Sequence, residues 1–147
     1  MSSSEDNPIE PIAIDIDSRM GVISEEKAIE LIRSTPIGRV AFNDGDDILA
    51  LPVNFKWHEG TIVFRTLEGH KLSAASAGQN VCFEVDHWDP SDKSGWSVVI
   101  QGTAREVTNW AEKEQLENIG LVPWTKEKWR RMWVRIEPTT ISGRVLS

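Results

Sequence analysis

The chain has 147 residues, of which 39% are hydrophobic and 27% are charged, and its formal net charge is −7. A chain of this length fits one domain that buries roughly two-thirds of its unfolded surface. The first basic residue is Arg19, and five acidic residues precede it, so most of the acidic excess lies in this leader. The remainder is close to neutral, which argues against nucleic acid or an anionic membrane as a partner.

The composition also favours a cytoplasmic protein. The N-terminus lacks the basic start and apolar core of a signal peptide, and no apolar run approaches the length that spans a membrane. The single cysteine, Cys82, can form no internal disulfide and lies in an apolar, strand-like run. We therefore expect a buried, inert side chain there rather than a catalytic thiol.

The chain divides into a leader and a folded domain. Residues 1–19 combine Ser, Pro and acidic residues with isolated isoleucines, which is typical of a flexible leader or of an arm laid across a partner subunit. Residues 20–147 are expected to form the domain. Ser24 has the residue type of a helix N-cap and two glutamates follow it, while Pro36 ends the predicted helix.

From Gly38 the hydrophobic period changes to that of strands. Pro52 lies inside one predicted strand and indicates an edge position or a bulge, and Gly102 indicates a bend in another. Strands are predicted over 39–42, 48–57, 61–66, 80–88, 96–107, 132–136 and 140–145, and short helices over 69–78 and 110–118. Six or seven antiparallel strands with small helices predict a mainly β fold, a closed or partly closed barrel.

The most informative stretch is residues 63–72, where a strand ends, a loop with Gly69 follows and a helix is predicted to begin. A helix N-terminus offers unpaired N–H groups, Thr66 adds a hydroxyl, and Arg65 or Lys71 adds a positive charge. This pattern is typical of a phosphate site. It also fits an ordinary strand-to-helix connection whose Arg and Lys are solvated.

Four blocks of sequence, in order, resemble the pyridoxamine 5′-phosphate oxidase-like family of FMN-binding split β-barrels. They are Leu51-Pro52-Val53-Asn54-Phe55, then Phe64-Arg65-Thr66 with Gly69-His70-Lys71-Leu72, then Gly95-Trp96-Ser97-Val98-Val99 with Gly102, and finally Trp133-Val134-Arg135-Ile136-Glu137-Pro138 with Ser142-Gly143-Arg144. The resemblance covers the chain from about Ser24 to Ser147. It implies a six- to seven-stranded antiparallel split barrel that works as a homodimer, with the cofactor at the subunit interface.

The resemblance also implies roles for individual residues. Thr66 and Lys71 would bind the FMN phosphate with Arg65 as a helper, and Val53 and Asn54 would lie against the isoalloxazine ring. Trp96 and Ser97 would line the same pocket, and segments near 80–88 or Trp133 could come from the partner. The full set implied to bind the cofactor is Pro52, Val53, Asn54, Phe64, Arg65, Thr66, His70, Lys71, Leu72, Trp96 and Ser97.

These observations lead to an FMN-dependent oxidoreductase acting on a small organic molecule, closer to the flavin reductase and nitroreductase branch than to the authentic oxidase. The basic residues that hold the oxidase's pyridoxal phosphate product have no clear match in this chain. Two alternatives stay open, a reductase that uses the deazaflavin F420 and a non-enzymatic flavin or haem carrier. The three histidines, at 58, 70 and 87, lack metal-ligand spacing, so no metal site is expected.

Overall fold

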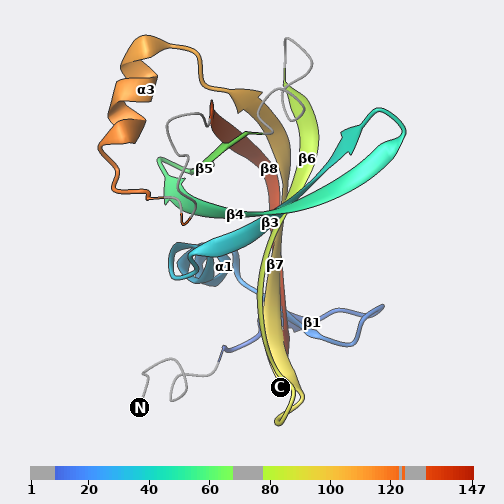
Figure 1. Ribbon diagram of the computed structural model, residues 1–147. Helices are drawn as coiled ribbons and strands as arrows, with labels where there is room; N and C mark the ends of the chain where they lie inside the picture. Colours follow the sequence, from blue (N-terminus) through green and yellow to red (C-terminus); the bar gives the residue numbers. More distant parts are fainter. Residues whose placement is uncertain (1–8, 68–77, 123, 125–131) are drawn as a thin grey trace.

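The structure is a computed structural model, and it describes residues 9–67, 78–122, 124 and 132–147. Antiparallel strands make up most of these residues (Figure 1). The strands are β1 (Ala13–Ile14), β2 (Gly21–Ile23), β3 (Ile37–Asp44), β4 (Asp47–His58), β5 (Thr61–Thr66), β6 (Gln79–Asp89), β7 (Ser94–Glu106) and β8 (Met132–Leu146), and the helices are α1 (Glu25–Arg33) and α3 (Trp110–Glu117). The helix predicted over 69–78 lies outside the described residues.

The strands form one sheet in the order β1-β2-β8-β5-β4-β3-β6-β7, and a further pairing of β7 with β8 closes six of them into a ring. This arrangement confirms the predicted mainly β split barrel. The short strands β1 and β2 extend the sheet from the far half of β8, where Gly21 lies opposite Val145. They were not among the predicted strands, because pairings of two and three residues leave no periodic pattern.

The last two predicted strands are one continuous strand, so the prediction of a break between 136 and 140 was wrong. Pro138 suggested the break, but a bulge absorbs it. Gly102 of β7 lies opposite Pro138 and Gln101 opposite Thr140, which leaves Thr139 as an extra residue. Gly102 is required at this bend, since a Cβ there would lie 2.4 Å from the carbonyl oxygen of Glu137.

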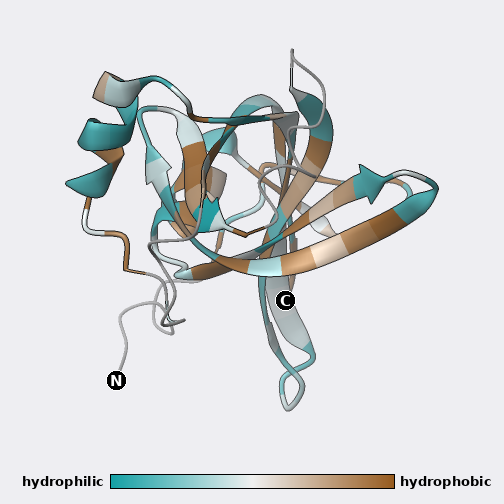
Figure 2. Ribbon diagram, turned by 45° about the horizontal axis from the view of Figure 1, so that its top comes forward, coloured by the Kyte–Doolittle hydropathy of each residue, from teal (hydrophilic) through white to brown (hydrophobic). Residues whose placement is uncertain are grey.

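One hydrophobic core fills the ring, and a small second core lies under α3. In the ring, Phe55 and Phe83 meet edge to face with centroids 4.8 Å apart. The helix α1 covers one end of the ring and buries Ala28 and Ile32, and Ser24 caps it by accepting a hydrogen bond from the N–H of Lys27, as predicted. Figure 2 shows the apolar strand segments gathered around the centre and the hydrophilic side of α3 facing outward.

The second core is built from Val63, Val107, Leu116 and Trp133. The buried Arg135 lies beside it, and its guanidinium donates to Glu112 of α3 at 2.9 Å and to Thr61 at 2.7 Å. These contacts fix α3 against β5 and β8. Among the described residues, no helix is both long and apolar enough to cross a membrane.

Candidate functional site

Strands β4 and β5 separate where the site was predicted. Their last paired residues are Phe55 and Phe64, and in the described part of the chain β4 residues 47–54 pair with β3 alone. Pro52 therefore lies at an open edge, as its missing N–H predicted. The separation leaves a wedge between the edge of β4 and the end of β5, with residues from two of the four sequence blocks on its sides.

The backbone of β4 presents polar groups to this open edge. Successive residues of an antiparallel strand direct their N–H and C=O groups to alternate sides. The N–H of Phe55 points toward β3, because it donates to the carbonyl oxygen of Pro36 at 3.4 Å. The N–H groups of Ala50 and Asn54 and the carbonyl of Pro52 therefore point toward the open edge. This edge offers both donors and an acceptor to a flat polar molecule.

The three predicted residues of β5 have different environments. Phe64 is fully buried in the main core, and Thr66 is 4% exposed on the same face of the strand. Arg65 lies on the opposite face, where its guanidinium is 3.0 Å from Glu117 of α3 and 4.9 Å from the centroid of the Trp133 ring. Arg65 thus joins β5 to α3. The other predicted residues of this element, His70, Lys71 and Leu72, lie outside the described residues.

Of the β4 residues, Val53 points into the core, whereas Asn54 faces outward. Val53 is 7% exposed, and its N–H and C=O point toward β3, as those of Phe55 do. The side-chain oxygen of Asn54 accepts a hydrogen bond from the backbone N–H of Trp124 at 3.0 Å. Asn54 therefore ties the segment that follows α3 to the edge of β4.

The structure does not bring Trp96 and Ser97 to this edge within the protomer. Ser97 lies opposite Arg144 and Trp96 opposite Val145, whereas Arg65 lies opposite Trp133 at the other end of β8. At about 3.3 Å per residue, the path along β8 between these points is roughly 40 Å. Trp96 and Ser97 are also neighbours in β7, so their side chains point to opposite faces of the sheet. The two residues thus belong to the far arm of the molecule, below the ring in Figure 1.

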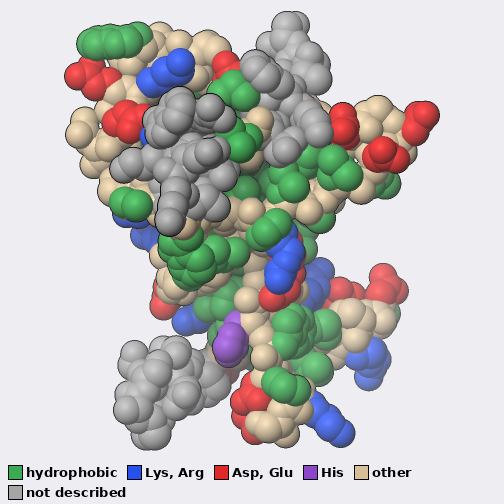
Figure 3. Space-filling model, viewed as in Figure 1, with side chains coloured by type: hydrophobic (Ala, Val, Ile, Leu, Met, Phe, Trp, Pro, Cys, Tyr) green, Lys and Arg blue, Asp and Glu red, His purple; other side chains and the backbone are tan. Residues whose placement is uncertain are grey.

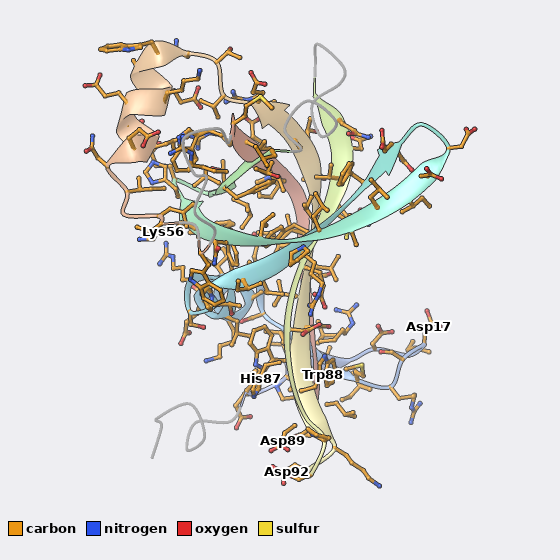
Figure 4. The ribbon with its side chains drawn as sticks, viewed as in Figure 1. Asp17, Lys56, His87, Trp88, Asp89 and Asp92 are labelled. Atoms are coloured by element: carbon orange, nitrogen blue, oxygen red, sulfur yellow. The ribbon has the colours of Figure 1, made fainter. Side chains whose placement is uncertain are left out.

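A cleft of about 600 Å³ opens beside Asn54. The sequence analysis did not predict it, because three separate segments form it, the end of α1, the outer face of β4 and the residues after α3. Lys56 crosses one side and donates from its ammonium to the carbonyl of Ile119 at 2.9 Å (Figure 4). The polar and aromatic lining residues are Arg33, Ser34, Thr35, Asn54, Phe55, Lys56, Trp57 and Trp124.

A family model for pyridoxamine 5′-phosphate oxidase matches residues 24–145. The chain belongs to this family. The uncharacterized protein Rv0080 of Mycobacterium tuberculosis is 32% identical over an alignment of 126 residues, and the match covers 82% of either chain. A Corynebacterium glutamicum protein named after pyridoxamine 5′-phosphate oxidase has a similar solved structure, with a TM-score of 0.76 and 33% identity over 87% of this chain and 98% of its own. The solved structure of an FAD binding protein of Mycobacterium smegmatis is also similar. Its TM-score is 0.69 and its identity 34%, and the match covers 86% of this chain and 99% of that protein.

The match to the oxidase family begins at Ser24, so the segment from Ile9 to Ile23 lies outside it. The structure nevertheless attaches this segment to the family's barrel. A salt bridge of 2.8 Å joins Asp15 to Arg144 of β8 and lowers the pKa of the Asp15 carboxyl to about 2. The N-terminal hairpin thus belongs to the folded part of this chain.

A second polar cluster lies on the outer face of the oxidase-family barrel, over β3 and β6. The guanidinium of Arg39 on β3 is 3.4 Å from the Glu84 carboxylate and 3.7 Å from that of Asp86, both on β6. Burial, and the hydrogen bond and repulsion from Asp86, raise the pKa of Glu84 to about 7. Cys82 lies on the same face and is half-buried, because Val81 and Phe83 are the neighbours that face the core.

Proposed function

We propose that the protein binds FMN along the open edge of β4 and catalyses oxidation or reduction of a small organic molecule. The observation that carries the proposal is the wedge that opens where β5 leaves β4. It begins after the last pair, Phe55 and Phe64, and the end of β5 at Thr66 forms one of its sides. The family supports it, as does the FAD binding protein of Mycobacterium smegmatis, which shares 34% of its aligned residues.

The residues present fit a flavin. The pyrimidine edge of an isoalloxazine ring has two carbonyl oxygens and one N–H. The carbonyl of Pro52 and the N–H of Asn54 offer an acceptor and a donor to this edge of the ring, whereas the N–H of Ala50, four residues and about 13 Å from that of Asn54, lies beyond its reach. Because Val53 and Phe64 are buried, we assign neither side chain a contact with the flavin.

We assign the phosphate to the end of β5 and the residues after it. Thr66 supplies a hydroxyl and Lys71 a charge, with His70 and Leu72 flanking them, as the sequence motif predicts. For Arg65 the ion pair with Glu117 supports a positioning role, since the guanidinium lies on the other face of β5 from Thr66. Arg65 would hold the strand end and α3 in place rather than contact the phosphate.

When bound, the flavin supplies the redox chemistry by accepting or donating a hydride. The backbone N–H of Asn54 would favour negative charge at the pyrimidine end of the ring. Asn54 also holds the Trp124 backbone through its side chain, and Lys56 holds the Ile119 carbonyl, so the two together fix the wall of the adjoining cleft. We propose this cleft, of about 600 Å³, as the place of the organic substrate.

We further propose that the working unit is a homodimer. Trp96 and Ser97 match the family's pocket motif, yet they lie at the far end of β8 from Arg65 and Thr66. In a homodimer they would join the flavin pocket of the second copy. The site would then combine β4 and β5 of one protomer with β7 of its partner, which agrees with the subunit-interface cofactor that the family resemblance implies.

The test is to purify the full chain gently, denature it and identify the released chromophore by absorbance and mass. Released FMN supports the proposal, FAD changes the nucleotide but keeps the site, and a Soret band indicates haem instead. If the protein is empty, titration with FMN, FAD and F420 follows, with tryptophan fluorescence as the readout. A chain that binds none of the three is not a flavin or deazaflavin oxidoreductase.

A further inference from the structure

The cleft beside Asn54 is positively charged, although the chain as a whole carries a net charge of −7. Arg33, the last residue of α1, and Lys56 of β4 both line the cleft, and none of its described lining residues is an Asp or a Glu. Figure 3 shows acidic side chains over α3 and at the tip of the β3–β4 hairpin. The cleft thus concentrates positive charge in an acidic protein.

Both cations keep donors for a ligand. The Lys56 ammonium has three N–H donors, and one of them is used by the carbonyl of Ile119 at 2.9 Å. In the described part of the chain, no carboxylate forms an ion pair with Lys56 or with Arg33. Glu30, one turn before Arg33 on α1, pairs with Lys27 at 3.3 Å instead. Arg33 and Lys56 are both exposed, so an anion in the cleft can reach them.

The end of α1 does not oppose a bound anion. The last carbonyls of a helix carry a partial negative charge, which by itself would repel one. Here the hydroxyls of Ser34 and Thr35 donate to the carbonyl of Leu31 at 2.9 Å and 2.7 Å. These bonds satisfy that carbonyl from within the protein, and the guanidinium of Arg33 adds a full positive charge at the same helix end.

The rest of the cleft is apolar and aromatic. Val122 and Trp124 line it and are 64% and 72% exposed, and the half-buried Trp57 lines it as well. The backbone N–H of Trp124 donates to Asn54 at 3.0 Å, which holds this indole-bearing residue against β4. Exposed apolar side chains gathered at one concave site mark a ligand surface, and indole rings favour flat aromatic ligands.

We propose that the cleft binds aromatic carboxylates, and that these are the substrate class of the protein. The carboxylate would accept hydrogen bonds from Arg33 and Lys56, and the ring would lie against Trp57 and Trp124. The inference rests on the proposed function for the position of the flavin. Asn54 joins the two places, because its side chain lines the cleft while its N–H points to the open edge of β4. The volume, about 600 Å³, suits a small organic molecule.

The test measures binding of three probes of one shape to the full chain by isothermal titration calorimetry. The probes are 2-naphthoate, which is an anion, the neutral 2-naphthalenemethanol and the cation 2-naphthylmethylamine. We expect the naphthoate to bind about tenfold more tightly than the alcohol, and the amine to bind more weakly than either. The preference for the anion should shrink as salt is added, because ions screen exposed charges.

Variants assign the charge preference to the two cations. Arg33→Met and Lys56→Met should each weaken naphthoate binding about fivefold or more and leave the alcohol within about twofold. Lys113→Met is the control, because it removes the same charge from an exposed position on α3 and should leave naphthoate binding within about twofold. Lys56 also holds Ile119, so equal loss of both probes in Lys56→Met would indicate a loosened wall. Arg33→Met then decides.

Flavin binding is measured separately, so the two proposals can fail separately. Naphthoate that does not bind, or binds no better than the alcohol, overturns the assignment to aromatic carboxylates and leaves the flavin site standing. Unchanged naphthoate affinity in Arg33→Met and Lys56→Met overturns it as well, as does equal weakening by Lys113→Met. A chain that binds no flavin but holds naphthoate through these two residues overturns the flavin proposal and keeps the cleft as a carboxylate site.

Discussion

Arg65 of β5 and Glu117 of α3 form an ion pair at 3.0 Å, and the same carboxylate oxygen accepts the indole N–H of Trp133 at 2.9 Å. One acceptor thus joins three elements of the second core, because Trp133 belongs to β8. The guanidinium also lies over the Trp133 ring, so the charge is paired and stacked at once. Arg65 thus has a structural role, although it belongs to the predicted phosphate motif and lies one position before Thr66.

Glu117→Gln should lower the free energy of unfolding by about 1–3 kcal/mol, because it removes the charged acceptor that Arg65 and Trp133 share. Urea unfolding followed by tryptophan fluorescence measures the loss. Glu114→Gln on the exposed side of α3 is the control and should change stability by less than about 0.5 kcal/mol. If both variants unfold alike, the contact has no net stabilising effect.

Much of the barrel could be predicted from local pattern. The prediction of a strand over 61–66 agrees with β5, Thr61–Thr66, since a continuous apolar run ends there at turn residues. The alternation of Val81, Phe83 and Val85 predicted their common buried face. Such features depend on the strand period, which a sequence shows directly. Ser24 is likewise recognisable, because an N-cap is a contact with a residue three positions away.

The features that create the site depend on distant residues, and the sequence could not show them. Where β5 leaves β4 is a property of sheet curvature, and no residue type announces that Phe55 and Phe64 are the last pair. The partner of Arg65 is 52 positions away in α3. Pro138 suggested the end of a strand, because the bulge that absorbs it requires the matching bend at Gly102 in another strand.

Lys71→Ala should weaken FMN binding by about 1–3 kcal/mol, the contribution of a charge-assisted hydrogen bond. Fluorescence titration measures the dissociation constant, and Lys93→Ala in the β6–β7 hairpin is a control that removes the same charge far from the wedge. Unchanged affinity in Lys71→Ala would show that Lys71 does not bind the phosphate. The contacts at the β4 edge are independent of that result. A second variant, Thr66→Val, addresses the other phosphate contact.

Stability should fall as pH rises from about 4.5 toward 7, because the pKa of Glu84 is raised from 4.5 in the unfolded chain to about 7 in the folded one. The folded state binds this proton more tightly than the unfolded chain does, so the stabilisation is complete below pH 4.5 and is lost above about pH 7. The side chain is 28% exposed, and solvent screening limits the change to about 1 kcal/mol.

Glu84→Gln should flatten this part of the pH profile, measured as the urea midpoint between pH 4.5 and 8. Arg39 lowers the pKa of Glu84, whereas burial and Asp86 raise it. Arg39→Met should therefore raise this pKa further, so that the loss of stability extends to higher pH values. A wild-type profile that rises through this range would show that burial and Asp86 do not raise the pKa of Glu84 as predicted.

Asp15→Asn should loosen the N-terminal hairpin without unfolding the barrel. The salt bridge to Arg144 lowers the pKa of Asp15 from 3.8 to about 2, so it stabilises the hairpin above pH 3.8 and is lost as pH falls toward 2. Hydrogen exchange at the amides of Ile12 and Asp15, which bond across the hairpin, reports the change. These amides should exchange faster in the variant at pH 7, while those of β5 keep their rates.

The control is Asp17→Asn, because Asp17 lies two residues away with an exposed side chain and should leave the exchange at Ile12 unchanged. Equal exchange in all three proteins would mean that Pro11 and the backbone pairing fix the hairpin without the salt bridge to Arg144.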